Sequence, residues 1–107
     1  KIKRRKKKMK SKRSRACDIT AKVKRTVWER DGQRCIICGS SSAMPNAHYI
    51  PRSKGGLGIE QNIVTLCQNC HYMTDQSINR PYYLAFIKAY LEKHYPGFSD
   101  RERVYRK

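Results

Sequence analysis

Residues 35–39 read CIICG and residues 65–71 read TLCQNCH, so two Cys-x2-Cys pairs stand 28 residues apart. Two thiolates separated by two residues aim both sulfurs at one point, and two such pairs complete the tetrahedral site that Zn²⁺ prefers. The spacing therefore predicts one structural zinc ion, which would bind Cys35, Cys38, Cys67 and Cys70.

Three other interpretations of the cysteines stay open. Redox dithiols belong at helix starts in α/β proteins, for which this chain is too short and too basic. Iron accepts the same four thiolates as zinc. His71 could replace one thiolate, although it directly follows Cys70 and adjacent residues rarely reach the same vertex. Cys17 has no partner at ligand spacing and is expected to be a free thiol.

The length and the charge of the chain restrict its class. Its 107 residues allow one domain with a modest core, which a metal cross-link would help to stabilise. The net charge of +17 is uneven: residues 1–30 hold 15 Lys/Arg and 2 acids, residues 31–79 hold 3 and 3, and residues 80–107 hold 7 and 3. Cationic ends around a neutral module are typical of proteins that bind nucleic acid.

Neither a membrane span nor a secretory signal is expected. No apolar run approaches the roughly 20 residues that cross a bilayer, and the basic N-terminal run lacks the apolar segment of a secretory signal. Metal-bound thiolates favour a reducing compartment. The expected location is therefore intracellular, without membrane contact.

The composition predicts a disordered basic arm over residues 1–16, one domain over residues 17–97 and a basic tail over residues 98–107. Ile19, Val23 and Val27 recur at helical spacing, with Trp28 as an expected core anchor. The remaining elements are strands at 34–37, 46–50 and 63–66, a helix from 71 that breaks at 77–79, and a last helix that begins after Asn79 and ends at Pro96. The aromatic residues of this last helix are expected to pack.

The order of motifs across residues 26–76 resembles the HNH endonucleases, most closely the small cysteine-containing members of bacteriophages and prophages. The resemblance rests on the two cysteine pairs, on AHYIPRSKGG at residues 47–56 and on NIVTLCQNCH at residues 62–71. It implies an α+β chain with the small ββα-metal fold, in which a strand pair and a helix grip one divalent ion. Here the fold would carry the structural four-cysteine zinc site and be flanked by N-terminal and C-terminal helices.

Phosphodiester hydrolysis needs a deprotonated water and a cation on the scissile phosphate. Histidine titrates near neutrality, so His48 is the expected general base, the role that the resemblance also gives it. Asn62, by resemblance, fastens the loop and orients His48, although a plain turn residue is the alternative. His71 and Asp75 stand four apart on a predicted helix and are expected to bind the catalytic ion, which is Mg²⁺, Mn²⁺, Ni²⁺ or Zn²⁺.

One position departs from the family pattern. Many members carry an acidic residue or a second histidine just before the general base, and that residue binds the metal; here it is Ala47. Asp75 could substitute, the Asn46 carbonyl could approach the ion, or water could hold most of it. A protein that keeps only DNA binding is the fourth alternative.

Basic residues near His48 are the expected DNA contacts. Arg52 and Lys54 follow His48, and glycines at 55, 56 and 58 would let backbone approach a duplex. Solvated surface is the alternative for each. Further candidate DNA-binding residues on the first predicted helix are Lys22, Lys24 and Arg25.

The predicted function is a metal-dependent DNA endonuclease that nicks or cuts double-stranded DNA and leaves a 5′ phosphate and a 3′ hydroxyl. The alternative is a non-catalytic zinc-ribbon DNA-binding module, or a partner subunit of a phage terminase-type machine. A ribosomal or other RNA-binding protein would leave His48 and Asn62 without a role. The chain is expected to act in the cytoplasm of a bacterial host, as a monomer or a weak homodimer, with phage terminase subunits as further candidate partners.

Overall fold

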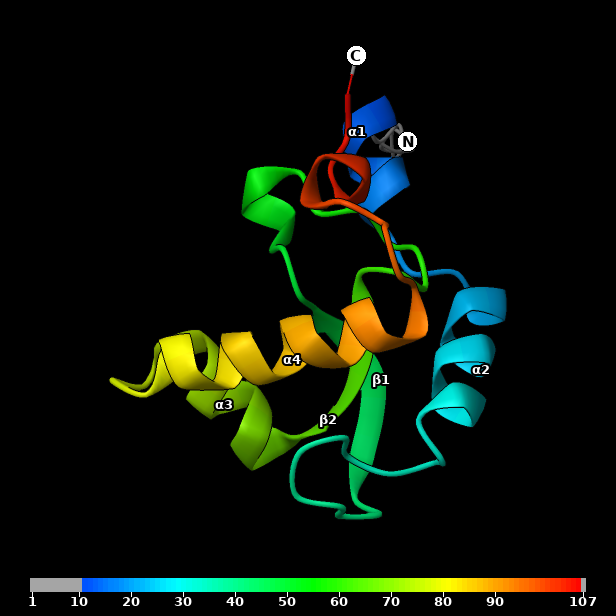
Figure 1. Ribbon diagram of the computed structural model, residues 1–107. Coiled ribbons are helices and arrows are strands. Elements are labelled where there is room, and N and C mark those ends of the chain that lie inside the picture. Colours follow the sequence, from blue (N-terminus) through cyan, green and yellow to red (C-terminus); the bar gives the residue numbers. More distant parts are fainter. Residues whose placement is uncertain (1–10, 107) are drawn as a thin grey trace, which may run out of the picture.

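The computed structural model describes residues 11–106 and places a two-stranded antiparallel sheet among helices (Figure 1). Residues 1–10 of the predicted arm lie outside the described residues, as does Lys107. Among the described residues, no helix has the length and apolar character of a membrane span. The elements in chain order are α1 (Lys12–Cys17), α2 (Ala21–Arg30), β1 (Ala43–His48), η1 (Arg52–Lys54), β2 (Ile63–Cys67), α3 (Gln68–Gln76), α4 (Arg80–His94) and η2 (Asp100–Arg103).

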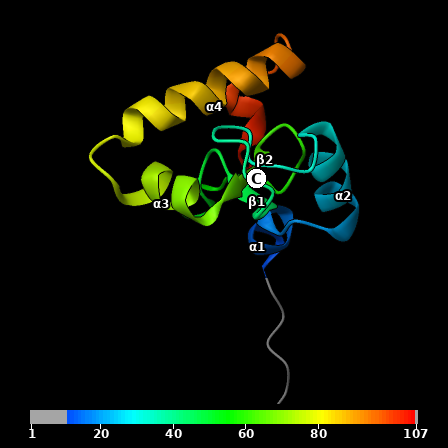
Figure 2. The same cartoon turned by 90° about the horizontal axis from the view of Figure 1, so that it is seen from below.

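The strands form the centre of the fold, with α3 on one side and α2 on the other (Figures 1 and 2). β1 pairs with β2 in a register that runs from Ala43 opposite Cys67 to His48 opposite Ile63, with an irregularity between Met44 and Ala47. All five residues of β2 are buried. The predicted strand at 63–66 is confirmed, and the one at 46–50 begins and ends earlier than expected.

The strand predicted at residues 34–37 is wrong. These residues form the turn of the first cysteine pair, in which Gly39 N donates to Cys35 O at 3.0 Å. Ile36 N donates to Thr65 O at 3.1 Å and attaches the turn to β2. Two thiols that must face one point need a tight turn, which an extended strand cannot provide.

The three predicted helices are confirmed, with local differences at their ends. Thr20 Oγ1 accepts from Val23 N at 3.2 Å and caps α2. α3 begins at Gln68, before the predicted start, because Cys67 Sγ accepts from Cys70 N and caps the helix. α4 has a proline in its first turn, but Asn79, at the cap position, makes no side-chain capping bond.

α4 packs only part of its aromatic surface. Ile87 and Leu91 are buried in the main core, and Tyr83 and Tyr90 pack against it. Tyr82 and Phe86 are 73% and 40% exposed, so the prediction that these two rings pack is wrong. Both lie on the helix face that points away from the sheet.

The basic arm does not extend to residue 16. Residues 12–17 form α1, and Ser11 Oγ caps it by accepting from Ser14 N at 3.1 Å. Cys17 is buried, and Ala16 O accepts from Gly58 N at 3.0 Å. The cap and this long-range contact order a segment whose composition alone predicts no fold. As predicted, Cys17 forms no disulfide.

The basic tail is likewise part of the folded unit. Arg103 is 1% exposed and donates through Nε to Gln61 O at 2.6 Å. Leu57 N donates to Arg103 O, and Tyr105 N donates to Gly55 O, both at 2.8 Å. The guanidinium lies over the ring of Tyr49 at 5.7 Å. A buried, hydrogen-bonded arginine therefore stands where charge counting predicts a solvated tail.

Candidate metal centre and active site

The four cysteines of the two pairs converge on one point. Their sulfurs lie within 4.8 Å of one another, and this is the only cluster of three or more potential metal ligands among residues 11–106. Cys38 Sγ and Cys67 Sγ are 3.5 Å apart. Four thiolates at about 2.3 Å from a zinc ion would stand about 3.8 Å from one another, so the sulfur geometry fits a tetrahedral ion.

Backbone amides support these sulfurs. Ile37 N and Cys38 N lie 3.4 Å and 3.5 Å from Cys35 Sγ, and Cys70 N donates to Cys67 Sγ at 3.4 Å. Burial opposes ionisation of the Cys35 thiol, but backbone N–H donors such as that of Cys38 outweigh it and lower its pKa to about 7. Such amide contacts orient thiolate ligands and stabilise their charge. The cluster is built to bind a cation.

His48 ends β1 and faces a backbone oxygen. Its Nε2 lies 2.9 Å from the carbonyl oxygen of Cys17. Because a carbonyl only accepts, Nε2 carries the proton, and the lone pair of the neutral ring is on Nδ1. Burial lowers the pKa of His48, and the nearby Arg52 and His71 lower it further against the opposing effect of the Cys17 carbonyl. His48 is therefore neutral at neutral pH.

Asn62 is fully buried and ties together the loop that follows β1. Its Oδ1 accepts from Ile50 N at 2.9 Å, and its Nδ2 donates to Ile50 O at 3.1 Å and Leu57 O at 2.9 Å. Asn62 O also accepts from Tyr49 N at 2.7 Å, next to His48. These bonds fix the start and the end of the loop relative to β1.

The glycines of this loop face the protein interior. A Cβ on Gly56 would lie 1.6 Å from Ile50 O, and one on Gly58 would lie 2.0 Å from Asp18 O. Gly55, Gly56 and Gly58 are all buried. The expectation that they let backbone approach a duplex is therefore wrong, because they let the loop approach its own chain.

His71 and Asp75 lie one turn apart on α3 and face each other. His71 Nε2 is 3.3 Å from Asp75 Oδ2, and both side chains are partly exposed. Two atoms this close, one nitrogen and one oxygen, could share a divalent ion. Ala47, where many family members have a ligand, is 2% exposed and belongs to the core.

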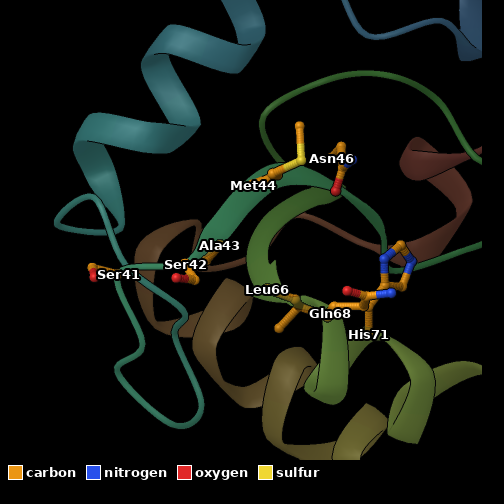
Figure 3. A pocket seen from close by; sticks show the side chains of 8 residues that line it. All are labelled: Ser41, Ser42, Ala43, Met44, Asn46, Leu66, Gln68 and His71. Carbon is orange, nitrogen blue, oxygen red and sulfur yellow. The ribbon is translucent and has the colours of Figure 1, made fainter.

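Four hollows lie around these residues, in two pairs that share lining residues, and the surface that carries all four is called the groove below. The His48 hollow has a volume of about 360 Å³ and is also bordered by Lys54 and Asp75. The His71 hollow, of about 480 Å³, is bordered by Asn46 of β1 and Gln68 of α3 (Figure 3). These two hollows share no lining residue, but His71 of one and Asp75 of the other are 3.3 Å apart.

The groove continues at both ends. The Arg13 hollow shares Ser53 with the His48 hollow, and the Trp28 hollow shares Ala43 and Met44 with the His71 hollow. In the described residues, Asp75 is the only acid that borders the groove. The six basic residues that border it are Arg13, Lys24, Arg25, Arg52, Lys54 and Arg80.

Not all of the predicted DNA-binding residues border the groove. Lys24 and Arg25 border the groove, whereas Lys22 is exposed on α2 and borders none of its hollows. Arg52 Nη1 is held by Asp18 Oδ1 at 3.0 Å, and its carbonyl accepts from Arg13 Nη2 at 3.4 Å. Sequence reasoning missed Arg13, Arg80 and the Cys17 carbonyl, because no motif marks them.

Comparisons with known proteins identify the family of the chain. A family model described as HNH endonuclease matches residues 35–87. The Anaredoxin of Nostoc sp. is 35% identical over 51 residues, which cover 47% of this chain and 67% of that protein.

A solved structure shares the fold. The Type IV phosphorothioation-dependent restriction endonuclease ScoMcrA superposes with a TM-score of 0.55 at 22% identity, over 67% of this chain. The matched region is 17% of that much longer protein. Together with the fold and the cysteine cluster, the sequence matches establish that the chain belongs to the HNH endonuclease family.

Proposed function

We propose that this chain is a metal-dependent endonuclease that hydrolyses phosphodiester bonds of double-stranded DNA. One observation carries the proposal: His48, the His71–Asp75 pair and six basic side chains border one groove. A base that titrates near neutrality, a potential metal site and surrounding cations are the groups that this hydrolysis requires.

His48 acts as the general base. Its Nδ1 accepts a proton from the attacking water, while Nε2–H stays bonded to the Cys17 carbonyl at 2.9 Å. The water oxygen bonds to phosphorus as the bond to the 3′ oxygen breaks. Solvent protonates that oxygen, which leaves a 5′ phosphate and a 3′ hydroxyl. Asn62 acts indirectly, because it holds the loop beside His48.

His71 and Asp75 would hold the catalytic ion, with Mg²⁺, Mn²⁺, Ni²⁺ or Zn²⁺ as candidates. Two protein ligands suit an ion such as Mg²⁺ that keeps several waters and binds a substrate phosphate. Asn46, on the border of the His71 hollow, offers an additional carbonyl oxygen near the place that Ala47 leaves without a ligand. When bound, the ion neutralises charge on the phosphate in the transition state.

The four-cysteine cluster holds zinc with a structural role in this proposal. Cys67 is both a ligand and the cap of α3, so zinc would fix the start of the helix that carries His71 and Asp75. The groove residues Arg52, Lys54, Lys24 and Arg25 contact phosphates, with Lys22 as an outer contact. Association with terminase subunits stays a prediction.

A second candidate is a non-catalytic DNA-binding module. The buried, ligand-free Ala47 favours it, because this position of the site supplies no metal ligand. This candidate predicts DNA retention that weakens with salt, without cleavage.

Relaxation of supercoiled plasmid separates the two. The purified protein is incubated with EDTA, Mg²⁺, Mn²⁺ or Ni²⁺ beside His48→Ala and the matched control His94→Ala, an exposed histidine of α4 outside the groove. We expect metal-dependent nicking that His48→Ala abolishes and His94→Ala keeps. Equal nicking by His48→Ala would refute the assigned base, and DNA binding without cleavage under every metal would favour the second candidate.

A further inference from the structure

We propose that the Trp28 hollow receives an unstacked nucleobase of the DNA strand that crosses the groove, so that single-stranded or locally opened DNA is the preferred ligand. This inference deepens the proposed function and rests on it, because the strand that supplies the base is the one presented to His48.

The hollow lies between α2 and β1, and the side chains that line it suit a flat ring. Trp28 and Pro45 border it, with Met44, which is 60% exposed. Its volume of about 440 Å³ lies in the range of ligand pockets, about 300–1,000 Å³. Val27 occupies the core beneath α2, which leaves Trp28 half-buried at the edge rather than in the core position that the sequence predicts.

The basic side chains around the hollow favour a negatively charged ligand. Lys24 stands four residues before Trp28 and Arg25 three, so both share the helix face of the indole. No acidic residue borders this hollow. An apolar floor with a cationic rim matches a nucleotide, whose base is flat and whose phosphate is negative, and combined aromatic and basic groups are the usual means of binding single strands.

The hollow also adjoins the His71 hollow. It shares Ala43 and Met44 with the His71 hollow. Along β1, the four residues from Met44 to His48 span about 13 Å, so a strand of a few nucleotides can reach from the hollow to the proposed base.

The test uses the only tryptophan of the chain as a reporter. The protein is titrated with a short oligodeoxythymidylate, and separately with the same strand annealed to oligodeoxyadenylate, while the Trp28 emission is recorded. We expect strong saturable quenching by the single strand and weaker quenching by the duplex. Met44→Ala should weaken single-strand affinity about 10-fold and leave duplex affinity unchanged.

The control variants separate stacking from general effects. Ile78→Ala removes a 93% exposed apolar side chain outside the groove and should leave both affinities unchanged. Trp28→Phe keeps a flat ring and should keep the preference for single strands, read by anisotropy of a labelled strand. Equal effects of Met44→Ala on both DNA forms would overturn the proposal.

Three further outcomes would also overturn it, and a fourth would support it. DNA binding with unchanged Trp28 emission would contradict this inference alone. A lack of DNA binding at low salt would contradict the proposed function as well. Quenching that depends on protein concentration without DNA would assign the hollow to a second copy of the chain. Quenching without cleavage would support the nucleobase site and count against hydrolysis.

Discussion

At the scale of single residues, the proposed general base depends on a backbone atom. The Cys17 carbonyl sets the tautomer of His48, and Gly58 lets the backbone of residues 17–18 come close enough to do so. The thiol of Cys17 is not the group that touches His48. Substitutions that move the backbone should therefore affect activity more than the loss of a side chain.

Gly58→Ala tests this dependence. The new Cβ would lie 2.0 Å from Asp18 O and 2.9 Å from Cys17 O, so the carbonyl must move away from His48. A shift of about 1 Å in a catalytic group can cost about 100-fold in rate, and we expect a loss of this size in the nicking assay. Gly97→Ala, where a Cβ meets nothing within 4 Å, is the control and should keep its activity. Unchanged nicking by Gly58→Ala would contradict the role of the carbonyl.

The pH dependence of nicking reports the state of His48. Burial lowers the pKa of His48, with a further contribution from Arg52, and the base must be unprotonated. Therefore kcat/KM should keep its plateau below the ordinary histidine pKa of about 6.5 and fall only at more acidic pH. Arg52→Gln should raise the pKa of His48 and move this acid limb to higher pH. Arg34→Gln, an exposed arginine outside the groove, should leave the limb unmoved.

At the scale of elements, two connections hold the proposed site together. Helix α3 joins the cysteine cluster to His71 and Asp75, and the carboxylate of Asp31 joins α2, β2 and α4. α3 begins at a cysteine ligand and carries His71 and Asp75 within its first turns. Asp31, just after α2, accepts from Thr65 N of β2 at 2.8 Å and from Tyr90 OH of α4 at 2.6 Å. Loss of either connection should detach a whole helix from the rest of the fold.

Cys70→Ala should prevent metal binding and leave α3 unfolded. In small domains a structural zinc ion contributes about 10–16 kcal/mol, which is comparable to the whole stability of about 5–15 kcal/mol. We expect purified Cys70→Ala to contain no zinc and to lose helical circular dichroism and its cooperative melting. Cys17→Ala, which removes a buried thiol outside the cluster, should retain zinc. Stoichiometric zinc in Cys70→Ala would refute the assigned ligand set.

Asp31→Ala should destabilise the fold strongly. It removes the partner of the Arg30 guanidinium, which lies 2.7 Å away, and leaves buried donors without acceptors. Breaking a buried pair in this way costs about 3–5 kcal/mol. Tyr90→Phe removes only one of these bonds and should cost about 1 kcal/mol. Urea unfolding measures both, and equal effects would show that Asp31 acts only through Tyr90.

Helices were the elements easiest to predict, because their signals are local. The spacing of Val23 and Val27 and the proline after Arg80 mark α2 and α4 directly. The first cysteine turn resembles a strand in sequence, since its residues are β-branched, and only the metal geometry decides its shape. α1 and η2 depend on contacts with the loop after β1, for which the sequence has no local pattern.

At the scale of the whole molecule, the groove explains where the positive charge acts. The net charge of +17 is spread over much of the chain, but six basic residues and one acid border the groove. The composition predicts that the partner is a polyanion. Which surface the polyanion would follow can be inferred only from the tertiary structure. Arg13 and Arg80 are far apart in sequence and meet the groove only through folding.

The salt dependence of DNA affinity measures this path. Each phosphate contact adds about 0.9 to the slope of log affinity against log salt concentration. The double variant Lys24→Gln with Arg25→Gln should therefore lower the slope by about 2. The matched pair Lys88→Gln with Lys93→Gln, exposed on α4 and outside the groove, should change it little. Equal slopes for the two double variants would show that DNA does not pass the Trp28 hollow.

The loop beside His48 is fastened by hydrogen bonds to Ala16 on one side and to Arg103 and Tyr105 on the other. These partners lie between 42 and 50 residues away along the chain, and contacts of such high sequence separation carry a large loop-closure cost that slows folding. A ribosome makes the chain from its N-terminus, so Arg103 and Tyr105 emerge after every residue of the groove. Under the proposed function, the nascent polypeptide therefore lacks the fastened loop beside the base until these two residues have left the ribosome, and the order of synthesis would delay the start of cleavage.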